Sequence, residues 1–397
     1  MPPIIFRKGL DMKAAVADQL AVAYHSRIVD DLRSAGYART HGRLTIHLAR
    51  EFGFCYGVER AVDYAYQTRK KFPDSRVFLT GEIIHNPHVN NQLRAQGIRF
   101  LTDPGEDRTT LGRDDVVILP AFGVSVDDMV RLDRQGCTLV DTTCGSVLTV
   151  WKNVKHYAQD GFTSIIHGKL HHEETRATAS QASLFSNGHY LVVLDKGEAA
   201  AVCHYIVHGG DRGAFLERFG PASSPGFDPD RHLLRVGCAN QTTMLMAESL
   251  EIGDMFKAAM EARHGASTLG DVFRSFDTIC SATQERQDAL IALLAEAPLD
   301  LMVVIGGYNS SNTCNLAKIC AERCPTFHIA EAACLVSSSE IRHRPIGAPS
   351  TAAVAETVAR DWLPAQGPLV IGLTAGASTP NNVVGQVVAR LEALAGS

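Results

Sequence analysis

Three cysteines each stand between a strand-like apolar run and a helix-like run, and this repeated arrangement limits the fold most strongly. Cys144 follows the apolar pair Leu139-Val140, and the residues after it repeat apolar side chains at helical spacing. Cys55 and Cys280 follow apolar runs in the same way and also precede helical patterns. Because α/β proteins alternate strands and helices, the sequence predicts an α/β fold with three approximately repeated units.

Each of these cysteines is predicted to lie at the start of a helix. A thiol there feels the positive end of the helix dipole, which favours the thiolate that ligates metals. If the three units pack around one axis, Cys55, Cys144 and Cys280 converge and form a metal centre with one open ligand position. The alternative is that each is a buried cysteine acting as a small apolar side chain, but the matched trio favours the metal centre.

Polar loops follow the second apolar run of each unit and supply candidate binding residues. His85 and the run His172-Glu173-Glu174 come after such runs. Because ligands of parallel sheets bind at the carboxyl ends of strands, both loops are expected to face a substrate. An imidazole beside a carboxylate suits anion binding and proton delivery. Solvated surface loops are the alternative for both.

Two further segments have the composition of a phosphate cradle. Asn309-Ser310-Ser311-Asn312 precedes a helical pattern, and Ser378-Thr379-Pro380 follows a Gly-rich turn. Backbone N–H groups at a helix start, with hydroxyl and amide side chains, bind phosphate without Lys or Arg. Thr242, after another apolar run, can donate to a substrate hydroxyl or a water. Ordinary helix capping is the alternative for these segments.

Other cysteines and histidines form less complete sets. Cys320 and Cys324 share a helix face, but Cys314 lies off that face, so core or subunit-contact roles are favoured. His204 and His208 are four residues apart without a third ligand, so a metal site there is not favoured. The remaining cysteines are interpreted as core residues, namely Cys137, Cys203, Cys238 and Cys334.

Composition narrows the class of protein. A chain of 397 residues with 45% hydrophobic side chains can build two or three domains. A net charge of −5 does not indicate the excess of basic residues that is typical of nucleic-acid-binding proteins. The sequence lacks the roughly 18-residue apolar run of a membrane helix, and its first residues do not resemble a signal peptide. We therefore expect a cytoplasmic protein, where ten cysteines stay reduced.

Seven short motifs occur in order between residues 44 and 394. They are Gly53-Phe54-Cys55-Tyr56-Gly57-Val58, Asp141-Thr142-Thr143-Cys144, His172-Glu173-Glu174-Thr175, Asn240-Gln241-Thr242-Thr243, Asp277-Thr278-Ile279-Cys280-Ser281-Ala282-Thr283, Asn309-Ser310-Ser311-Asn312 and Thr374-Ala375-Gly376-Ala377-Ser378. Together they resemble the LytB-type iron–sulfur enzymes, the 4-hydroxy-3-methylbut-2-enyl diphosphate reductases. His167-Gly168-Lys169 and the insert at residues 226–230 resemble the longer plant and cyanobacterial branch.

The resemblance implies a trefoil-like fold, in which three pseudo-repeated α/β units with mainly parallel sheets surround a central iron–sulfur cluster. The implied division is an N-terminal extension at residues 1–43 and units at 44–143, 144–279 and 280–397. A [4Fe-4S] cluster is implied on Cys55, Cys144 and Cys280, with one iron that lacks a protein ligand. Such an iron is easily lost in air, so a [3Fe-4S] or empty form is the alternative after exposure.

The implied activity is reductive removal of the allylic hydroxyl from a branched C5 diphosphate, giving isopentenyl and dimethylallyl diphosphate. This is the last step of the methylerythritol phosphate route to isoprenoids. The resemblance makes Glu174 the proton source, acting through Thr242, with Glu173 outside the site. It assigns substrate binding to His85, His172, Thr242, Ser310, Ser311, Asn312 and Ser378. Many members of the shorter branch carry a histidine where this chain has Phe122.

The sequence also limits the partners and leaves rival functions open. The glycines do not form G-x-G-x-x-G between a strand and a helix, so electrons are expected from a separate ferredoxin or flavodoxin. A homodimer remains open. One rival is a hydro-lyase that uses a similar cluster without a reductant. Another is a zinc-binding or cluster-sensing protein, which would not bind a C5 diphosphate tightly.

Overall fold

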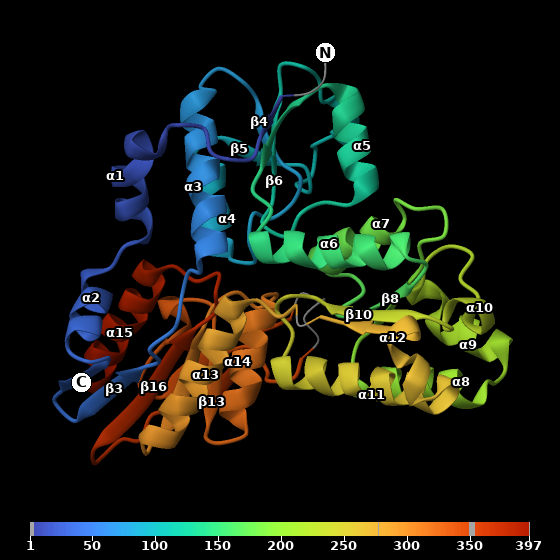
Figure 1. Ribbon diagram of the computed structural model, residues 1–397. Coiled ribbons are helices and arrows are strands. Elements are labelled where there is room, and N and C mark those ends of the chain that lie inside the picture. Colours follow the sequence, from blue (N-terminus) through green and yellow to red (C-terminus); the bar gives the residue numbers. More distant parts are fainter. Residues whose placement is uncertain (1–3, 277, 349–353, 397) are drawn as a thin grey trace. The chain divides into compact units, whose positions relative to one another are not determined.

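The computed structural model describes residues 4–276, 278–348 and 354–396 and forms two compact units (Figure 1). Unit 1 consists mainly of Phe122–Cys280, with short pieces at residue 4 and at Thr109–Arg113. Unit 2 consists of Ile5–Arg108, Asp114–Ala121 and Ser281–Ser397. The three-unit division at residues 43, 143 and 279 stays a prediction.

Unit 1 is built on a parallel sheet with the strand order β11-β10-β8-β9. These strands are β8 (Thr163–His167), β9 (Tyr190–Val193), β10 (Val236–Asn240) and β11 (Phe273–Ser275), and β7 (Thr138–Asp141) precedes them in the chain. Every residue of β8 and β10 is buried, as expected for parallel strands covered on both faces. The carboxyl ends of these strands carry the polar segments that begin at residues 167 and 240.

Helices cover the unit 1 sheet and build its core. The helices described in this unit are α5 (Val126–Gln135), α6 (Gly145–Gln159), α7 (Glu173–Ala182), α8 (Lys196–His208), α9 (Arg212–Phe219), α10 (Pro229–His232), α11 (Met246–His264) and α12 (Leu269–Val272). Phe256 of α11 and Val202 of α8 are fully buried and pack with Val236 of the sheet in one apolar cluster. This packing fixes the strand ends that carry the motifs.

Unit 2 contains a sheet with the strand order β13-β12-β16-β3-β2, in which only β2 runs antiparallel to its neighbour. Its strands are β2 (Ala38–His41), β3 (Leu44–Leu48), β12 (Leu301–Ile305), β13 (Thr326–Ile329) and β16 (Leu369–Ala375). The side chains of β3 alternate between buried and half-buried, so Leu44, Ile46 and Leu48 enter the core. The turn between β2 and β3 includes the predicted boundary at residue 43.

The rest of unit 2 includes a second parallel group, in which β4 (Val77–Leu79) pairs with β5 (Ile98–Phe100) and β6 (Val116–Leu119). An antiparallel pair is formed by β14 (Glu340–His343) and β15 (Thr357–Arg360), and β1 is Ile5–Phe6. The helices described in this unit are α1 (Lys13–Tyr24), α2 (Arg27–Ser34), α3 (Tyr56–Lys71), α4 (Pro87–Ala95), α13 (Ser281–Glu296), α14 (Ser311–Ala321) and α15 (Asn381–Ala395).

The N-terminal extension is part of the unit 2 core. Val29 and Leu32 of α2 are fully buried among the side chains of β3 and α15. The side-chain oxygen of Gln67 accepts hydrogen bonds from the backbone N–H groups of Leu10 and Met12. The N-terminal extension therefore forms helices that pack against the rest of unit 2.

The strand pairing confirms the expected α/β class with mainly parallel sheets. In the described part of the chain no helix combines the length and apolar character needed to cross a membrane.

Candidate functional site

Cys55 occupies the predicted position between a strand and a helix in unit 2. It is the N-cap residue of α3, is half-buried, and does not use its side chain to cap the helix. Its backbone N–H lies 3.3 Å from the carbonyl oxygen of Ala377. The guanidinium of Arg286 donates to the carbonyl oxygens of Gly53 and Phe54. Cys55 is thereby held beside the turn that follows β16.

The same turn meets the predicted phosphate cradle. Ser310 caps α14 by accepting a hydrogen bond from the backbone N–H of Thr313. The side-chain oxygen of Asn312 accepts from the backbone N–H of Ala377 at 2.9 Å. Ser378 donates from its hydroxyl to the carbonyl oxygen of His85 at 3.1 Å. These bonds bring the predicted residues Ser310, Asn312, Ser378 and His85 into one cluster within unit 2, and the adjacent Ser311 is also buried.

Asn312 has one polar group that the protein leaves unsatisfied. Its side chain is 2% exposed, and its Nδ2 has no hydrogen-bond partner among the described residues. A buried donor without a partner costs about 1–3 kcal/mol, which a ligand acceptor can recover. The group therefore fits an anionic ligand atom.

Two glycines allow the cradle to form at the end of β12. A Cβ atom on Gly307 would lie 2.2 Å from the carbonyl oxygen of His85. Gly306 has a φ of +148°, and a Cβ there would lie 2.6 Å from the hydroxyl oxygen of Thr379. A side chain at either position would therefore push the cradle apart.

Glu82 and Asn309 orient the His85 ring. The Nδ1 of His85 lies 2.8 Å from a carboxylate oxygen of Glu82, and the side-chain amide of Asn309 donates to the same oxygen at 2.9 Å. Burial alone would raise the pKa of Glu82, but the hydrogen bonds from His85 and Asn309 outweigh it and lower the pKa below its ordinary value. Glu82 therefore stays ionised and accepts the Nδ1–H of His85. Glu82 has no role in the sequence-based predictions, and Asn309 enters them only as part of the phosphate cradle, because the contact between Asn309 and Glu82 joins loops more than 200 residues apart.

The other two predicted cysteines belong to unit 1. Cys144 is the half-buried N-cap residue of α6 and, like Cys55, does not cap the helix with its side chain. The preceding turn is fixed by Asp141, whose carboxylate accepts from the backbone N–H and the hydroxyl of Thr143. Cys280 directly precedes α13, and its backbone N–H lies 3.3 Å from the carbonyl oxygen of Thr242.

Glu174 and Thr242 are in direct contact through a hydrogen bond. Glu174 is 1% exposed, and one of its carboxyl oxygens accepts the backbone N–H of Thr242 at 2.6 Å. His172 caps α7 by accepting the N–H of Glu174 at its Nδ1, so the proton of the neutral ring is on Nε2. Glu173 is exposed. Unit 1 thus joins a carboxyl group, a hydroxyl group and an imidazole donor.

Phe122 packs against His172. Its ring meets the ring of His172 edge to face, with 5.4 Å between the ring centroids. An apolar ring here contributes no hydrogen bond to an anion, but it limits the orientation of the imidazole.

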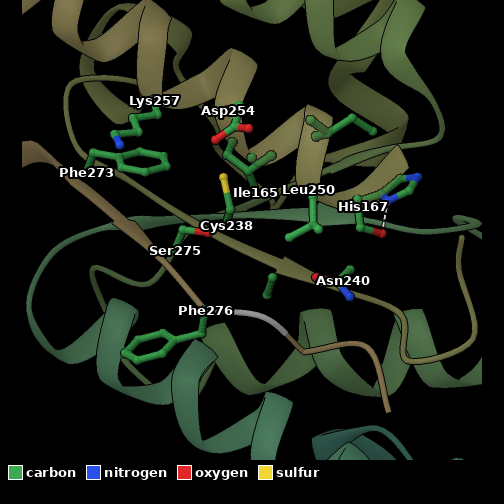
Figure 2. Close-up of a pocket in the computed structure, with 14 residues that line it drawn as sticks. Ile165, His167, Cys238, Asn240, Leu250, Asp254, Lys257, Phe273, Ser275 and Phe276 are labelled. Atoms are coloured by element: carbon green, nitrogen blue, oxygen red, sulfur yellow. Dashed lines mark hydrogen bonds between the residues drawn. The ribbon is translucent and has the colours of Figure 1, made fainter. Parts of the chain in front are cut away.

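A separate cavity of about 310 Å³ lies in unit 1 between α11 and the sheet. Figure 2 shows Cys238, Asn240 and Ser275 on the sheet side and Asp254 and Lys257 on the side of α11. The Nδ2 of Asn240 is buried without a hydrogen-bond partner in the described part of the chain. The hydroxyl of Thr278 donates to the side-chain oxygen of Asn240 at 2.7 Å. Asp277, the first residue of the motif that contains Thr278, lies outside the described residues.

The donor chemistry of the cysteines fits an iron–sulfur cluster. Cys55 and Cys144 present half-buried thiols at helix starts, and thiolates are the usual ligands of such clusters. By contrast, burial raises the pKa of Cys203 to about 12 and also raises the pKa values of Cys238 and Cys320. These three remain protonated, which supports their interpretation as core side chains.

Comparisons with known proteins identify the family of this chain. The family model described as LytB protein matches residues 46–392. A relative from Gloeobacter violaceus is 51% identical over 98% of this chain and 93% of its own length. A relative from Thermosynechococcus vestitus is 50% identical over 98% of this chain and 94% of its own length. Both are named 4-hydroxy-3-methylbut-2-enyl diphosphate reductase.

Solved structures show the same fold. One is a structure of (E)-4-hydroxy-3-methyl-but-2-enyl diphosphate reductase, described as the terminal enzyme of the non-mevalonate pathway. It matches with a TM-score of 0.53 and 25% identity, over 88% of this chain and 99% of its own. A reductase from Plasmodium falciparum matches with a TM-score of 0.61 and 20% identity, over 87% and 86% of the two chains. From the family model and the two full-length relatives, we conclude that this chain belongs to the LytB protein family.

Proposed function

We propose that this chain is a reductase that converts 4-hydroxy-3-methylbut-2-enyl diphosphate to isopentenyl and dimethylallyl diphosphate. The observation that carries the proposal is 51% identity, along almost the whole chain, to a relative named as that reductase. The reaction takes up two electrons and two protons, breaks the allylic C–O bond and releases the hydroxyl as water. The protein must therefore bind a diphosphate, deliver protons and receive electrons.

Cys55, Cys144 and Cys280 are the proposed ligands of a [4Fe-4S] cluster in which one iron has no protein ligand. When bound, this group supplies the electrons of the reduction. Cys55 and Cys144 are half-buried N-cap residues at the starts of α3 and α6, and thiolates are the usual ligands of such clusters.

The proposed role of unit 1 is proton delivery. Glu174 gives the proton that leaves with the substrate hydroxyl, and the Thr242 hydroxyl relays it. The backbone N–H of Thr242 donates to the Glu174 carboxyl at 2.6 Å, so the two residues are in direct contact, which supports the assignment. His172 can donate from Nε2 to a phosphate oxygen, because its Nδ1 is occupied by the Glu174 N–H.

The proposed role of unit 2 is to bind the diphosphate. Ser310, Ser311, Asn312 and Ser378 supply neutral donors near the start of α14, where the helix dipole favours an anion. His85 adds an imidazole that is oriented by Glu82. The unsatisfied Nδ2 of Asn312 supports this role, because a diphosphate oxygen would complete its hydrogen bonding.

The electron donor is proposed to be a separate ferredoxin or flavodoxin, because the sequence carries no G-x-G-x-x-G dinucleotide motif. The cytoplasm is the proposed compartment. Both the electron donor and the compartment are inferred from the sequence and from membership of the LytB protein family.

Anaerobic purification with iron and sulfide counts, followed by a dithionite-fed assay on the C5 diphosphate, tests the proposal. Native protein is expected to carry about four irons, as a [4Fe-4S] cluster requires, and to form both products. Cys144→Ser should lose iron and activity, whereas the control Cys324→Ser should keep both. A native protein that carries its iron but does not reduce this substrate would refute the function. Turnover without a reductant would instead identify a hydro-lyase.

A further inference from the structure

One face of α6, the helix labelled in Figure 1, carries apolar and basic side chains that line a shallow groove. We call this the α6 stripe, and its residues are Leu148, Trp151, Lys152, Lys155 and His156. They line a shallow groove of about 260 Å³. Leu148 is 45% exposed, and Lys152 and His156 are also exposed. An exposed leucine next to a half-buried tryptophan, bordered by polar groups, is typical of a protein-binding surface.

The α6 stripe is positive, although the chain as a whole has a net charge of −5. Residues 145–159 contain Lys152 and Lys155 but no Asp or Glu. Asp160 follows the helix, but its carboxylate is paired with Arg274, and Arg235 donates to its carbonyl oxygen. Cations therefore outnumber anions along the whole helix and at its end. Such a surface attracts an acidic partner.

The α6 stripe is rigidly connected to Cys144. The backbone N–H of Leu148 lies 3.0 Å from the carbonyl oxygen of Cys144, so the stripe begins one helical turn from this thiol. Trp151 is fixed because its indole N–H donates to the hydroxyl of Thr178 at 3.2 Å. The Trp151 ring also occupies the space that a side chain on Gly123 would need. A partner bound to the stripe would lie close to a proposed cluster ligand.

We propose that the α6 stripe is the docking surface for a small acidic protein that carries single electrons. The proposal rests on the proposed reductase function. Each docked carrier is oxidised by one electron, so two deliveries reduce one C5 diphosphate, which takes up two protons and loses its hydroxyl as water. A small groove with charges at its edge suits the brief contacts of electron-transfer partners, which bury less area than stable complexes.

The test compares two electron sources on the holoenzyme. The variant with both Lys152→Glu and Lys155→Glu is assayed with dithionite and with reduced ferredoxin, an acidic carrier. Dithionite needs no docking surface, so its rate should be unchanged. The ferredoxin-fed kcat/KM should fall about tenfold and lose its dependence on salt, because charge steering is removed. Lys152→Arg with Lys155→Arg should keep the native rate, and so should the control Lys257→Glu on α11.

A second measurement does not depend on activity. Carbodiimide joins a lysine amine to a carboxylate in direct contact, and mass spectrometry identifies the joined residues. Native protein mixed with ferredoxin should give cross-links at Lys152 and Lys155, and these should disappear at high salt. Cross-links confined to other lysines would overturn the proposal.

The outcomes separate this proposal from the reductase function. If native protein with its iron fails in the dithionite assay, the function is wrong. If dithionite drives turnover and the charge-reversed variant keeps its full ferredoxin-fed rate, the docking surface is wrong. A change in sedimentation of the variant without a change in the ferredoxin-fed rate would show that a second copy of the chain covers the stripe, and this also overturns the proposal.

Discussion

The two units differ in the chemistry of the residues that are proposed to act on the substrate. In unit 1, the buried carboxyl group of Glu174 accepts a hydrogen bond from the backbone N–H of Thr242, and the backbone N–H of Glu174 donates to His172. In unit 2, the residues at the start of α14 have hydroxyl and amide side chains. Among them, Asn312 accepts the N–H of Ala377 and has a buried Nδ2 without a hydrogen-bond partner among the described residues. Unit 1 therefore has groups that can transfer a proton, whereas unit 2 has donors that can hold an anion without changing charge. Replacing one residue in each unit should affect different kinetic constants.

The largest effect is expected from Glu174→Gln in unit 1. The amide keeps the shape of the side chain but cannot deliver a proton. General acid catalysis contributes about 10²–10⁴-fold, so kcat should fall by about 10³-fold while KM stays within a few fold. Steady-state kinetics with dithionite as reductant measure both constants, and the iron count should equal that of the native protein.

Glu173→Gln is the matched control, because it makes the same change at the exposed neighbouring position. Its kinetics should match those of the native protein. Full activity of Glu174→Gln would show that unit 1 does not deliver the proton through this residue.

A smaller effect, on KM, is expected from Asn312→Asp in unit 2. Aspartate keeps the oxygen that accepts the Ala377 N–H but replaces the unsatisfied Nδ2 donor by a charged oxygen. Loss of a hydrogen bond to a charged ligand costs about 1.5–3 kcal/mol, and like-charge repulsion adds to this. KM should rise about 100-fold, with a smaller change in kcat.

Isothermal titration with inorganic diphosphate gives a readout that does not depend on turnover, and affinity should fall in parallel with KM. Asn91→Asp adds the same charge at an exposed position of α4 and serves as the control. If Asn312→Asp lowered kcat and left diphosphate affinity unchanged, the division between a binding unit and a proton-transfer unit would be wrong.

The smallest effect concerns stability and applies to unit 2. His328 is fully buried, and its Nε2 lies 3.0 Å from the carbonyl oxygen of Gly306, beside the cradle. Burial lowers the pKa of His328 to about 3. As pH falls below about 6.5, the unfolded chain takes up a proton that the folded chain refuses, so stability falls with pH until about pH 3. Each pH unit in this window costs about 1.4 kcal/mol.

Urea unfolding at pH 7 and pH 5 measures this linkage. Between these values the native protein should lose about 2 kcal/mol more than His328→Gln, which cannot titrate. His167→Gln provides the comparison in unit 1, because burial lowers the pKa of His167 to about 4. Equal pH dependence of the native protein and the His328→Gln variant would show that folding does not lower the pKa of this histidine.

Local features of the site could be predicted from the sequence. The positions of Cys55 and Cys144 at helix starts follow from the switch between strand and helix periodicity, which involves only neighbouring residues. Ser310 and His172 were also recognisable before their helices, because capping chemistry is short in range.

Features that depend on distant segments could not be predicted in this way. The contact of Glu82 with His85 and Asn309 requires two loops to meet, and no periodicity encodes that meeting. The start of β10 could not be predicted from apolar character either, because Leu233 and Leu234 are apolar but β10 begins at Val236 and continues to Asn240. Leu233 is buried but follows directly after the short helix α10, so its apolar character reflects helix packing and not a strand.

The glycine pair at the end of β12 has a consequence for inhibitor design. A methyl group at Gly307 would collide with the backbone of His85. A compound that contacts the backbone of Gly307 would therefore contact atoms that the protein cannot alter by substitution. Resistance would have to arise at other positions that contact the compound, where a side chain can be replaced without displacing the main chain.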